Sequence, residues 1–221
     1  ERESYFEKFK SLHYKKGEVL LRAGDEPRGV FFLKKGFVRL YSLSKQGEEL
    51  TLIIFKPGEI FPITWMISNI PNAYNLLAMT PVEVKRAPRE DFLEYVRGNS
   101  DLFFDFLDEA LNRLSRILRR MEYLVFGNAH AKVASILLIC AERFGRKASG
   151  GILIEVPLTH SEIANLVGMT RETVSIEMKK LEKKKLIGYR GRLLIIKNLK
   201  GLARESQFDH EELEDVINLQ A

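Results

Sequence analysis

The hydrophobic pattern of this 221-residue chain changes near residue 99 from short alternating runs to a helical period. Beyond that point apolar residues recur at spacings of 3 and 4 in turn, which predicts one long helix over residues 99–126. At 1.5 Å per residue this helix would be roughly 40 Å long. The row consists of Phe104, Leu107, Leu111, Leu114, Leu118, Met121 and Val125.

This apolar row needs a second surface to cover it. No other heptad segment occurs in the chain, so the row predicts a homodimer in which two such helices pair. The alternative is a long core helix that packs within one subunit. The predicted dimer seam is Leu107, Leu111, Leu114, Leu118, Met121 and Val125. A second line, expected to pack on the preceding domain, is Phe103, Phe106, Ala110, Ile117 and Leu124.

The first hundred residues have the pattern of β structure. Short apolar runs are separated by turn residues, and Gly24, Gly36, Gly47 and Gly58 recur every 11–12 residues. This spacing predicts an antiparallel sandwich, jelly roll or barrel. The expected strands are Val19–Leu21, Val30–Leu33, Phe37–Tyr41, Leu50–Phe55 and Val82–Ala87. Together with the helices that follow, the fold class is α+β.

The segment after the long helix has the signals of a winged helix-turn-helix. A helix over Ala129–Phe144, a loop over Gly145–Gly151 and a short strand over Ile152–Val156 lead to Thr159-His160-Ser161-Glu162, a capping box that opens a short helix. Gly168 ends that helix and Thr170 caps the next one. Val174, Met178 and Leu181 are expected to face inward. Leu186–Tyr189 and Leu193–Ile196 then predict a hairpin wing.

The charge is distributed unevenly along the chain. Residues 127–200 contain 14 Lys and Arg against 6 Asp and Glu, a net charge of +8, whereas residues 1–126 have a net charge of +2. Residues 201–221 form an acidic tail with a net charge of −5. A basic block beside a nearly neutral one indicates a polyanion partner, although a solvated lysine-rich surface would look the same by charge alone.

These motifs together resemble the Crp/Fnr family of transcription regulators. The resemblance rests on Thr159 to Ala164, on Gly168-Met169-Thr170-Arg171-Glu172-Thr173-Val174-Ser175, and on Leu33 to Val38 in the N-terminal strands. It covers residues 10–200 and implies a cyclic-nucleotide-binding-like domain over 1–98, a dimerisation helix over 99–126 and a DNA-binding domain over 127–200. The tail, 201–221, lies outside it. The resemblance also implies that RNA polymerase is a partner.

The resemblance implies roles for the exposed side chains of the second helix. Arg171 and Glu172 match positions that contact bases, whereas Ile176 stands where the family commonly has a second base-reading arginine. Isoleucine can pack on a thymine methyl group but cannot hydrogen-bond a guanine; it could also simply fill a gap in the domain. The expected base-reading set is Arg171, Glu172, Ser175 and Ile176. The expected phosphate contacts are Thr159, His160, Ser161, Thr170, Lys179 and Arg192.

The residues that bind cyclic AMP in the family are missing. Pro62-Ile63 stands where a Gly-Glu pair is expected and Asn72-Ala73 where an Arg-Ser pair is expected, and residues 57–84 contain no Lys or Arg. A buried phosphate without a cation is costly to desolvate, so cyclic AMP is not the expected effector. The remaining possibilities are a small apolar effector or no effector at all. In the second case the apolar residues of this segment would simply form the core of the domain. The candidate effector pocket is Phe61, Pro62, Trp65, Tyr74, Ile117, Leu118 and Met121.

Other classes of protein find little support. Cys140 is the only cysteine and is expected in a helix core, while His13, His130, His160 and His210 form no cluster, so we expect neither a metal nor a cofactor. No signal peptide, membrane span or catalytic constellation is evident, which favours a cytoplasmic protein that is not an enzyme. We therefore expect a transcription regulator that binds a palindromic operator in double-stranded DNA as a homodimer. The alternative is a ligand-sensing barrel that regulates a protein partner.

Overall fold

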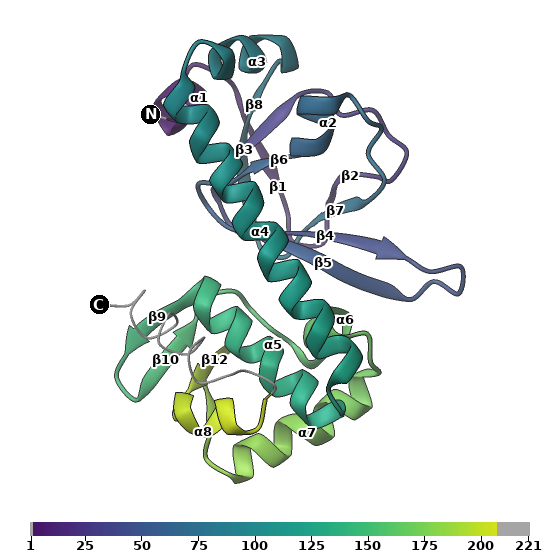
Figure 1. Cartoon of the computed structure of the whole chain (residues 1–221), viewed down its shortest axis with the longest axis vertical. Helices are drawn as coiled ribbons and strands as arrows, with labels where there is room; N and C mark the ends of the chain where they lie inside the picture. The colour runs from purple at the N-terminus through teal and green to yellow at the C-terminus, as the bar shows by residue number, and fades with distance from the viewer. Residues whose placement is uncertain (1, 207–221) are drawn as a thin grey trace. The chain divides into compact units, whose positions relative to one another are not determined.

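The computed structural model describes residues 2–206. Glu1 and residues 207–221 lie outside the described part, and with them His210 and most of the acidic tail. The chain divides into two compact units, Glu1–Arg113 and Leu114–Ala221, each of which is described by itself (Figure 1).

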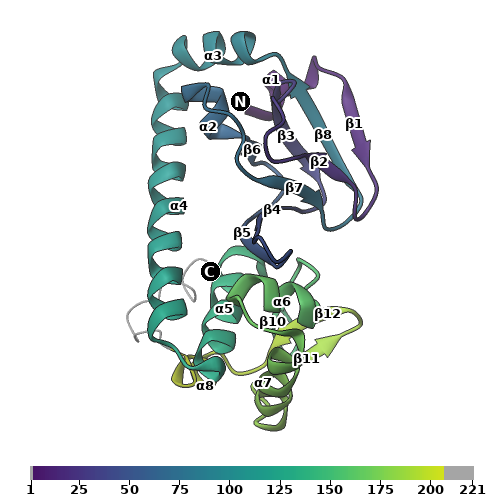
Figure 2. The same ribbon diagram turned by 90° about the vertical axis from the view of Figure 1, so that its right-hand side faces the viewer.

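The first unit contains two four-stranded antiparallel sheets (Figure 2). One has the order β1-β8-β3-β6, with β1 at Ser11–Tyr14, β3 at Val30–Lys35, β6 at Ile60–Phe61 and β8 at Val82–Ala87. The other has the order β2-β7-β4-β5, with β2 at Val19–Leu21, β4 at Val38–Leu43, β5 at Glu49–Phe55 and β7 at Asn75–Ala78. The predicted antiparallel β fold is confirmed, although β1, β6 and β7 were not predicted.

The two sheets share one apolar core, because alternate side chains of every strand face the same interior. Phe31, Phe55 and Phe61 meet at its centre, with ring centroids 5.7 Å apart for Phe31 and Phe61 and 4.8 Å apart for Phe55 and Phe61. Gly36 has a φ of +87°, and a Cβ at this position would overlap the Pro81 carbonyl oxygen. The Lys-Lys-Gly turn therefore requires its glycine.

Helices cover a second apolar cluster of the first unit. They are α1 at Arg2–Glu7, α2 at Ile63–Ser68, α3 at Arg89–Arg97 and the first part of α4, which extends over Ser100–Phe126. Phe6 and Phe92 are fully buried in this cluster, together with Trp65, Leu102 and Phe106. The predicted long helix is thus present, while the three shorter helices were not predicted from the sequence.

The buried side of α4 differs from the expected one. Of the second apolar line only Phe106 is buried, while Phe103, Ala110 and Ile117 are exposed. Leu102 and Phe106 lie inward, and the same side continues with Arg113, whose guanidinium pairs with Glu109 at 2.9 Å and lies 4.0 Å from Glu59. The expected line did not include Arg113 because an arginine is seldom buried, yet its guanidinium lies 5.2 Å from the Phe55 ring centroid and is paired with a carboxylate.

The second unit combines helices with one small sheet. The helices are α5 at Ala129–Phe144, α6 at His160–Val167, α7 at Arg171–Lys183 and α8 at Leu199–Arg204. The sheet has the order β11-β12-β10-β9, with β9 at Gly145–Ala148, β10 at Gly151–Ile154, β11 at Ile187–Arg190 and β12 at Leu193–Ile196. The expected loop over Gly145–Gly151 therefore contains a strand, because Gly145–Ala148 pairs with Gly151–Ile154.

The start of the expected tail is part of the folded domain. Helix α8 extends through Arg204, with Leu202 and Ala203 buried and Asn198 capping the helix through the Gly201 amide. The predicted start of the tail at residue 201 was based on the change of charge. The burial of Leu202 and Ala203 instead places residues 201–206 with the second unit. In the described part of the chain, no helix combines the length and the apolar character that crossing a membrane requires.

Candidate nucleic-acid interface

The helix-turn-helix is built from local capping signals. Thr159 Oγ1 accepts a hydrogen bond from the Glu162 amide at 3.2 Å, and the Glu162 carboxylate accepts one from the Thr159 amide at 2.6 Å. Gly168 ends α6 with a φ of 65°, and Thr170 Oγ1 caps α7 through the Thr173 amide at 3.2 Å. The predicted capping box and turn are confirmed. They fix where α6 begins and ends and where α7 begins.

Helix α7 has one buried and one exposed side. Val174, Met178 and Leu181 are fully buried, as predicted, and α6 contributes Ile163, Ala164 and Val167 to the same core. The spacing of the buried side chains turns Arg171, Glu172, Ile176 and Lys179 to the surface. Ser175 is half-buried at the edge of this surface.

Ile176 is the unusual member of this surface. Its side chain is 55% exposed, so it does not fill a gap in the core of the unit. Within the described residues, neither Arg171 nor Lys179 has an ion-pair partner, which leaves both positive charges available to an external anion. The exposed side of α7 thus presents free cations beside one apolar side chain.

Apart from Lys179, on the exposed side of α7, the expected phosphate contacts lie at the two helix starts and on the wing. The hydroxyl oxygens of Thr159 and Thr170 accept the capping bonds, and Ser161 is exposed beside Thr159 in the first turn of α6. Arg192 is exposed next to Gly191, the wing turn residue, which has a φ of 62°. His160 Nε2 lies 3.3 Å from the hydroxyl of Tyr189 on β11. Sequence analysis missed Tyr189, since only the folded wing places it beside α6.

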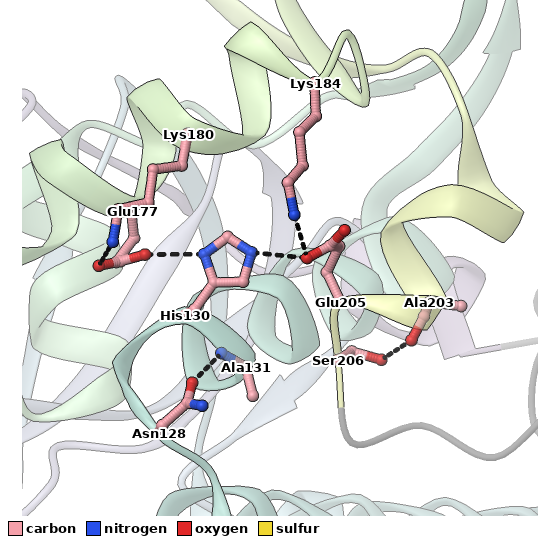
Figure 3. A network of polar contacts seen from close by, with 9 residues as sticks. All are labelled: Asn128, His130, Ala131, Glu177, Lys180, Lys184, Ala203, Glu205 and Ser206. Atoms are coloured by element: carbon pink, nitrogen blue, oxygen red, sulfur yellow. Dashed lines mark hydrogen bonds and ion pairs between the residues drawn. The ribbon is translucent and has the colours of Figure 1, made fainter.

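A polar network joins three helices of this unit (Figure 3). His130, on the first turn of α5, places Nδ1 2.7 Å from Glu177 of α7 and Nε2 2.9 Å from Glu205, which follows α8. Lys180 donates to Glu177 at 2.8 Å and Lys184 donates to Glu205 at 2.7 Å. Glu177 is a buried carboxylate on the inner side of α7, and no role for it was predicted from the sequence.

The charges of this network shift the pKa values of both carboxyl groups. Burial raises the pKa of Glu177, but the hydrogen bonds from Lys180 and His130 outweigh burial, and the net pKa lies below the usual value. The hydrogen bond from Lys184 lowers the pKa of Glu205 despite partial burial. Both groups are therefore carboxylates at neutral pH and act as hydrogen-bond acceptors only.

Two arginines of α4 attach this helix to the helix-turn-helix. Arg119 pairs with Glu142 of α5 at 2.5 Å, and Arg120 donates to the carbonyl of Leu166, near the end of α6. Burial lowers the pKa of Arg120 to about 10, so the guanidinium is still charged at neutral pH. Burial also raises the pKa of Cys140 to about 12, which keeps this thiol protonated and unreactive, in line with a core position.

The candidate effector residues occupy different surroundings. Phe61 is fully buried between the two sheets, whereas Trp65 belongs to the cluster under the helices, where the Arg89 guanidinium lies 5.7 Å from its ring centroid. Pro62 is buried and Tyr74 is exposed. On α4, Ile117, Leu118 and Met121 are exposed apolar residues. In the first unit, Phe61 and Trp65 are therefore core residues.

Asn72 has a structural role in the segment expected to hold an effector. Its amide nitrogen donates to the carbonyl of Arg22 at 2.8 Å and to that of Tyr74 at 2.6 Å, so both amide protons are used within the fold. A cavity of about 580 Å³ lies elsewhere in this unit, beside Tyr14, Leu21, Arg28 and Arg86. None of the candidate effector residues lines this cavity. Within residues 2–206, no group of His, Cys, Asp and Glu side chains could hold a metal ion.

Comparison with known proteins identifies both halves of the chain. Residues 11–99 match the cyclic nucleotide-binding domain family, and residues 131–205 match the Crp-like helix-turn-helix domain family. The chain belongs to the Crp/Fnr family. Members of this family are DNA-binding transcription regulators and not enzymes, so the predicted fold class and type of function are confirmed.

Individual relatives agree with this assignment over most of the chain. The global nitrogen regulator of Nostoc sp. is 27% identical over 194 residues, which cover 87% of each protein. The solved structure of a CooA mutant from Carboxydothermus hydrogenoformans is 27% identical with a TM-score of 0.75 and covers 91% of this chain and 89% of its own. FixK2 from Bradyrhizobium japonicum, at 22% identity, has a TM-score of 0.78 over 91% and 98% of the two chains.

Proposed function

We propose that this Crp/Fnr regulator binds a palindromic DNA operator as a homodimer paired through α4. The observation that carries the dimer is the seam: Leu107, Leu111, Leu114, Leu118, Met121 and Val125 are each between 43% and 70% exposed. Monomeric proteins rarely expose a contiguous apolar row of this kind, and the row keeps the 3–4 spacing of a coiled-coil interface. A second copy of the same helix is the complementary surface that the spacing favours.

A dimer of this kind explains how a short recognition helix can select a site. Two copies of α7 related by a twofold axis would read two half-sites roughly 34 Å apart, about one turn of DNA. In each half-site we assign Arg171, Glu172, Ser175 and Ile176 to base edges. Thr159, His160, Ser161, Thr170, Lys179 and Arg192 hold phosphates.

Cyclic AMP is not the effector in this proposal. The supporting observations are the absence of Lys and Arg from residues 57–84 and the use of both Asn72 amide protons inside the fold. Relatives include a "CRP-like cAMP-activated global transcriptional regulator" of Mycobacterium tuberculosis, 24% identical over 89% of this chain, as well as the global nitrogen regulators. For this chain we propose a small apolar effector or none.

DNA binding and its independence of cyclic AMP can be tested together. The full chain is titrated against a duplex recovered by site selection, at several salt concentrations and with or without millimolar cyclic AMP. We expect affinity to fall steeply as salt rises, because phosphate contacts release counterions, and to be unchanged by cyclic AMP. Binding without a salt slope would instead favour regulation of a protein partner, and a saturable rise in melting temperature with cyclic AMP would refute the assignment of the pocket.

We also propose RNA polymerase as a partner, and this part of the proposal is supported only by membership of the family. Because Crp/Fnr regulators act at promoters, we propose that the DNA-bound dimer contacts the polymerase. Transcription in vitro from a promoter that carries the selected site tests this directly. A change in transcript level that requires the intact site is the expected result, and no change with saturated operator would contradict it.

A further inference from the structure

The network around His130 has a hydrogen-bonding requirement that depends on a proton. Each ring nitrogen faces a carboxylate oxygen, at 2.7 Å from Glu177 and at 2.9 Å from Glu205. A carboxylate can only accept hydrogen bonds, and a neutral imidazole has one donor and one acceptor nitrogen. Only an imidazolium, with a proton on both nitrogens, can donate to both carboxylates at once.

The surrounding charges are arranged around that proton. Lys180 of α7 donates to the Glu177 oxygen that does not face His130, whereas Lys184, which follows α7, donates to the same Glu205 oxygen as the ring (Figure 3). Asn128 and Ala131, close to His130 at the start of α5, are uncharged. The charged groups that face the imidazole directly are therefore Glu177 from α7 and Glu205 from the end of α8. Loss of the proton leaves a ring lone pair directed at a carboxylate oxygen, which is repulsive.

The network holds the helix that reads DNA. Glu177 follows Ile176 on α7 and lies between the buried residues Val174 and Met178, so its side chain is on the inner side of the helix. His130 connects this point of α7 to the start of α5, and Glu205 connects it to the end of α8. The network therefore contacts the same helix whose outer side presents Arg171 and Ile176.

We propose that His130, Glu177 and Glu205 form a proton-dependent tie that positions α7, so that DNA affinity falls when the tie loses its proton at higher pH. His130 and Glu205 are positioning residues in this proposal, since they act through α7 and do not touch DNA. The inference rests on DNA reading by α7. The lowered pKa values of Glu177 and Glu205 support it, because both groups remain charged acceptors across the range in which histidines usually titrate.

The test compares pH profiles of operator affinity at fixed salt. His160 is a second imidazole and is one of the proposed phosphate contacts, so the comparison is made in the His160→Gln background. In that background we expect the dissociation constant to rise roughly tenfold from about pH 6 to about pH 8, the effect of losing one charged hydrogen bond.

The decisive second variant is Glu205→Gln, combined with His160→Gln. The amide nitrogen of the glutamine can donate to an unprotonated ring nitrogen while its oxygen accepts from Lys184, so the neutral ring is satisfied on both sides and the tie no longer needs the extra proton. We expect this variant to keep the affinity seen at low pH and to show a flat profile. Two profiles that coincide would overturn the proposal.

A measurement without DNA separates this proposal from the proposed function. The ¹⁵N signals of the His130 ring in the full-length wild-type chain report how many ring nitrogens carry a proton. We expect both nitrogens to carry a proton at pH 6. We also expect the amide chemical shifts of α7 to change when one of these protons is lost. A ring with one proton at pH 6, or deprotonation that leaves α7 unchanged, would overturn the tie even if the operator is bound.

Discussion

In the first unit Arg39 is buried and pairs with Glu49 at 2.5 Å, whereas in the second unit Arg171 lies on the surface of α7 without an ion-pair partner among the described residues. The same contrast holds for Lys34, which pairs with Glu7, and Lys179, which has no such partner in the described part. Arg39 and Lys34 thus pair with local carboxylates in the first unit, while Arg171 and Lys179 on α7 remain available. A net charge counted along the sequence becomes a binding surface only where its charges are not already paired.

The two units also differ in how they use aromatic side chains. Phe31, Phe55 and Phe61 fill the space between the two sheets, and Trp65 fills the cluster below the helices. In the second unit Tyr189 is 44% exposed, and its hydroxyl lies beside His160. Phe61 and Trp65, which the sequence placed in an effector pocket, are thus part of the core of the first unit, while the exposed Tyr189 lies beside His160, one of the proposed phosphate contacts.

The largest expected effect is a loss of stability when a core aromatic residue of the first unit is removed. Phe61→Ala removes a fully buried ring and leaves a cavity, which should lower the free energy of unfolding of the first unit by about 3–5 kcal/mol. Chemical denaturation measures this loss. Ile67→Ala, at an exposed position on α2, is the control and should change stability by less than about 0.5 kcal/mol. Equal effects of the two variants would show that Phe61 is not a core residue.

The next effect concerns the seam. Leu114→Glu places a charge in the proposed helix pair and should give monomers, with operator affinity reduced roughly a hundredfold because both half-sites can no longer be bound together. Sedimentation measures assembly and a DNA titration measures affinity. Asn112→Glu adds the same charge on another exposed face of α4 and should remain a dimer. A Leu114→Glu protein that stays a tight dimer would disprove the seam.

The sequence was sufficient where structure depends on neighbouring residues. Thr159, Glu162, Gly168 and Thr170 act within three or four residues of their partners, so caps and turn could be predicted with the correct boundaries. The same is true of the long helix, whose 3–4 spacing is local. The exposed residues of α7 followed from the three buried ones by helical geometry.

Contacts between distant residues could not be predicted in this way. The strand Asn75–Ala78 gains its place by pairing with Val38–Tyr41, and nothing in its own four residues specifies that pairing. His130 on α5, Glu177 on α7 and Glu205 just after α8 are far apart in the sequence, and each alone resembles an ordinary surface residue. Arg113 was not among the residues expected to pack, yet its guanidinium lies over the Phe55 ring and pairs with Glu109.

A smaller effect sharpens the difference between base and phosphate contacts. Arg171→Ala should cost about 1–3 kcal/mol of binding to the preferred operator and relax the choice of base at one position per half-site. Lys179→Ala should instead weaken binding to all sequences alike and lower the salt slope by about 1. Competition titrations with single-base operator variants distinguish the two. Equal loss on every sequence for Arg171→Ala would remove it from the base-reading set.

The smallest effect concerns the apolar residue on the same helix. Because isoleucine cannot hydrogen-bond a guanine, Ile176→Arg should change the preferred base pair at one position per half-site by about 1–3 kcal/mol and leave the others unchanged. Site selection with the variant reads this out position by position. Recovery of the original consensus would mean that residue 176 does not face a base.

The central claim is that two copies of α7, held by a pair of α4 helices, read one symmetric site. Selection of binding sites with the wild-type protein tests it most directly, with sedimentation of the complex to count the chains bound. The claim predicts a twofold-symmetric consensus whose half-site centres are about one DNA turn apart, with two chains on each duplex. A consensus without a dyad, or one chain per duplex at full occupancy, would contradict it.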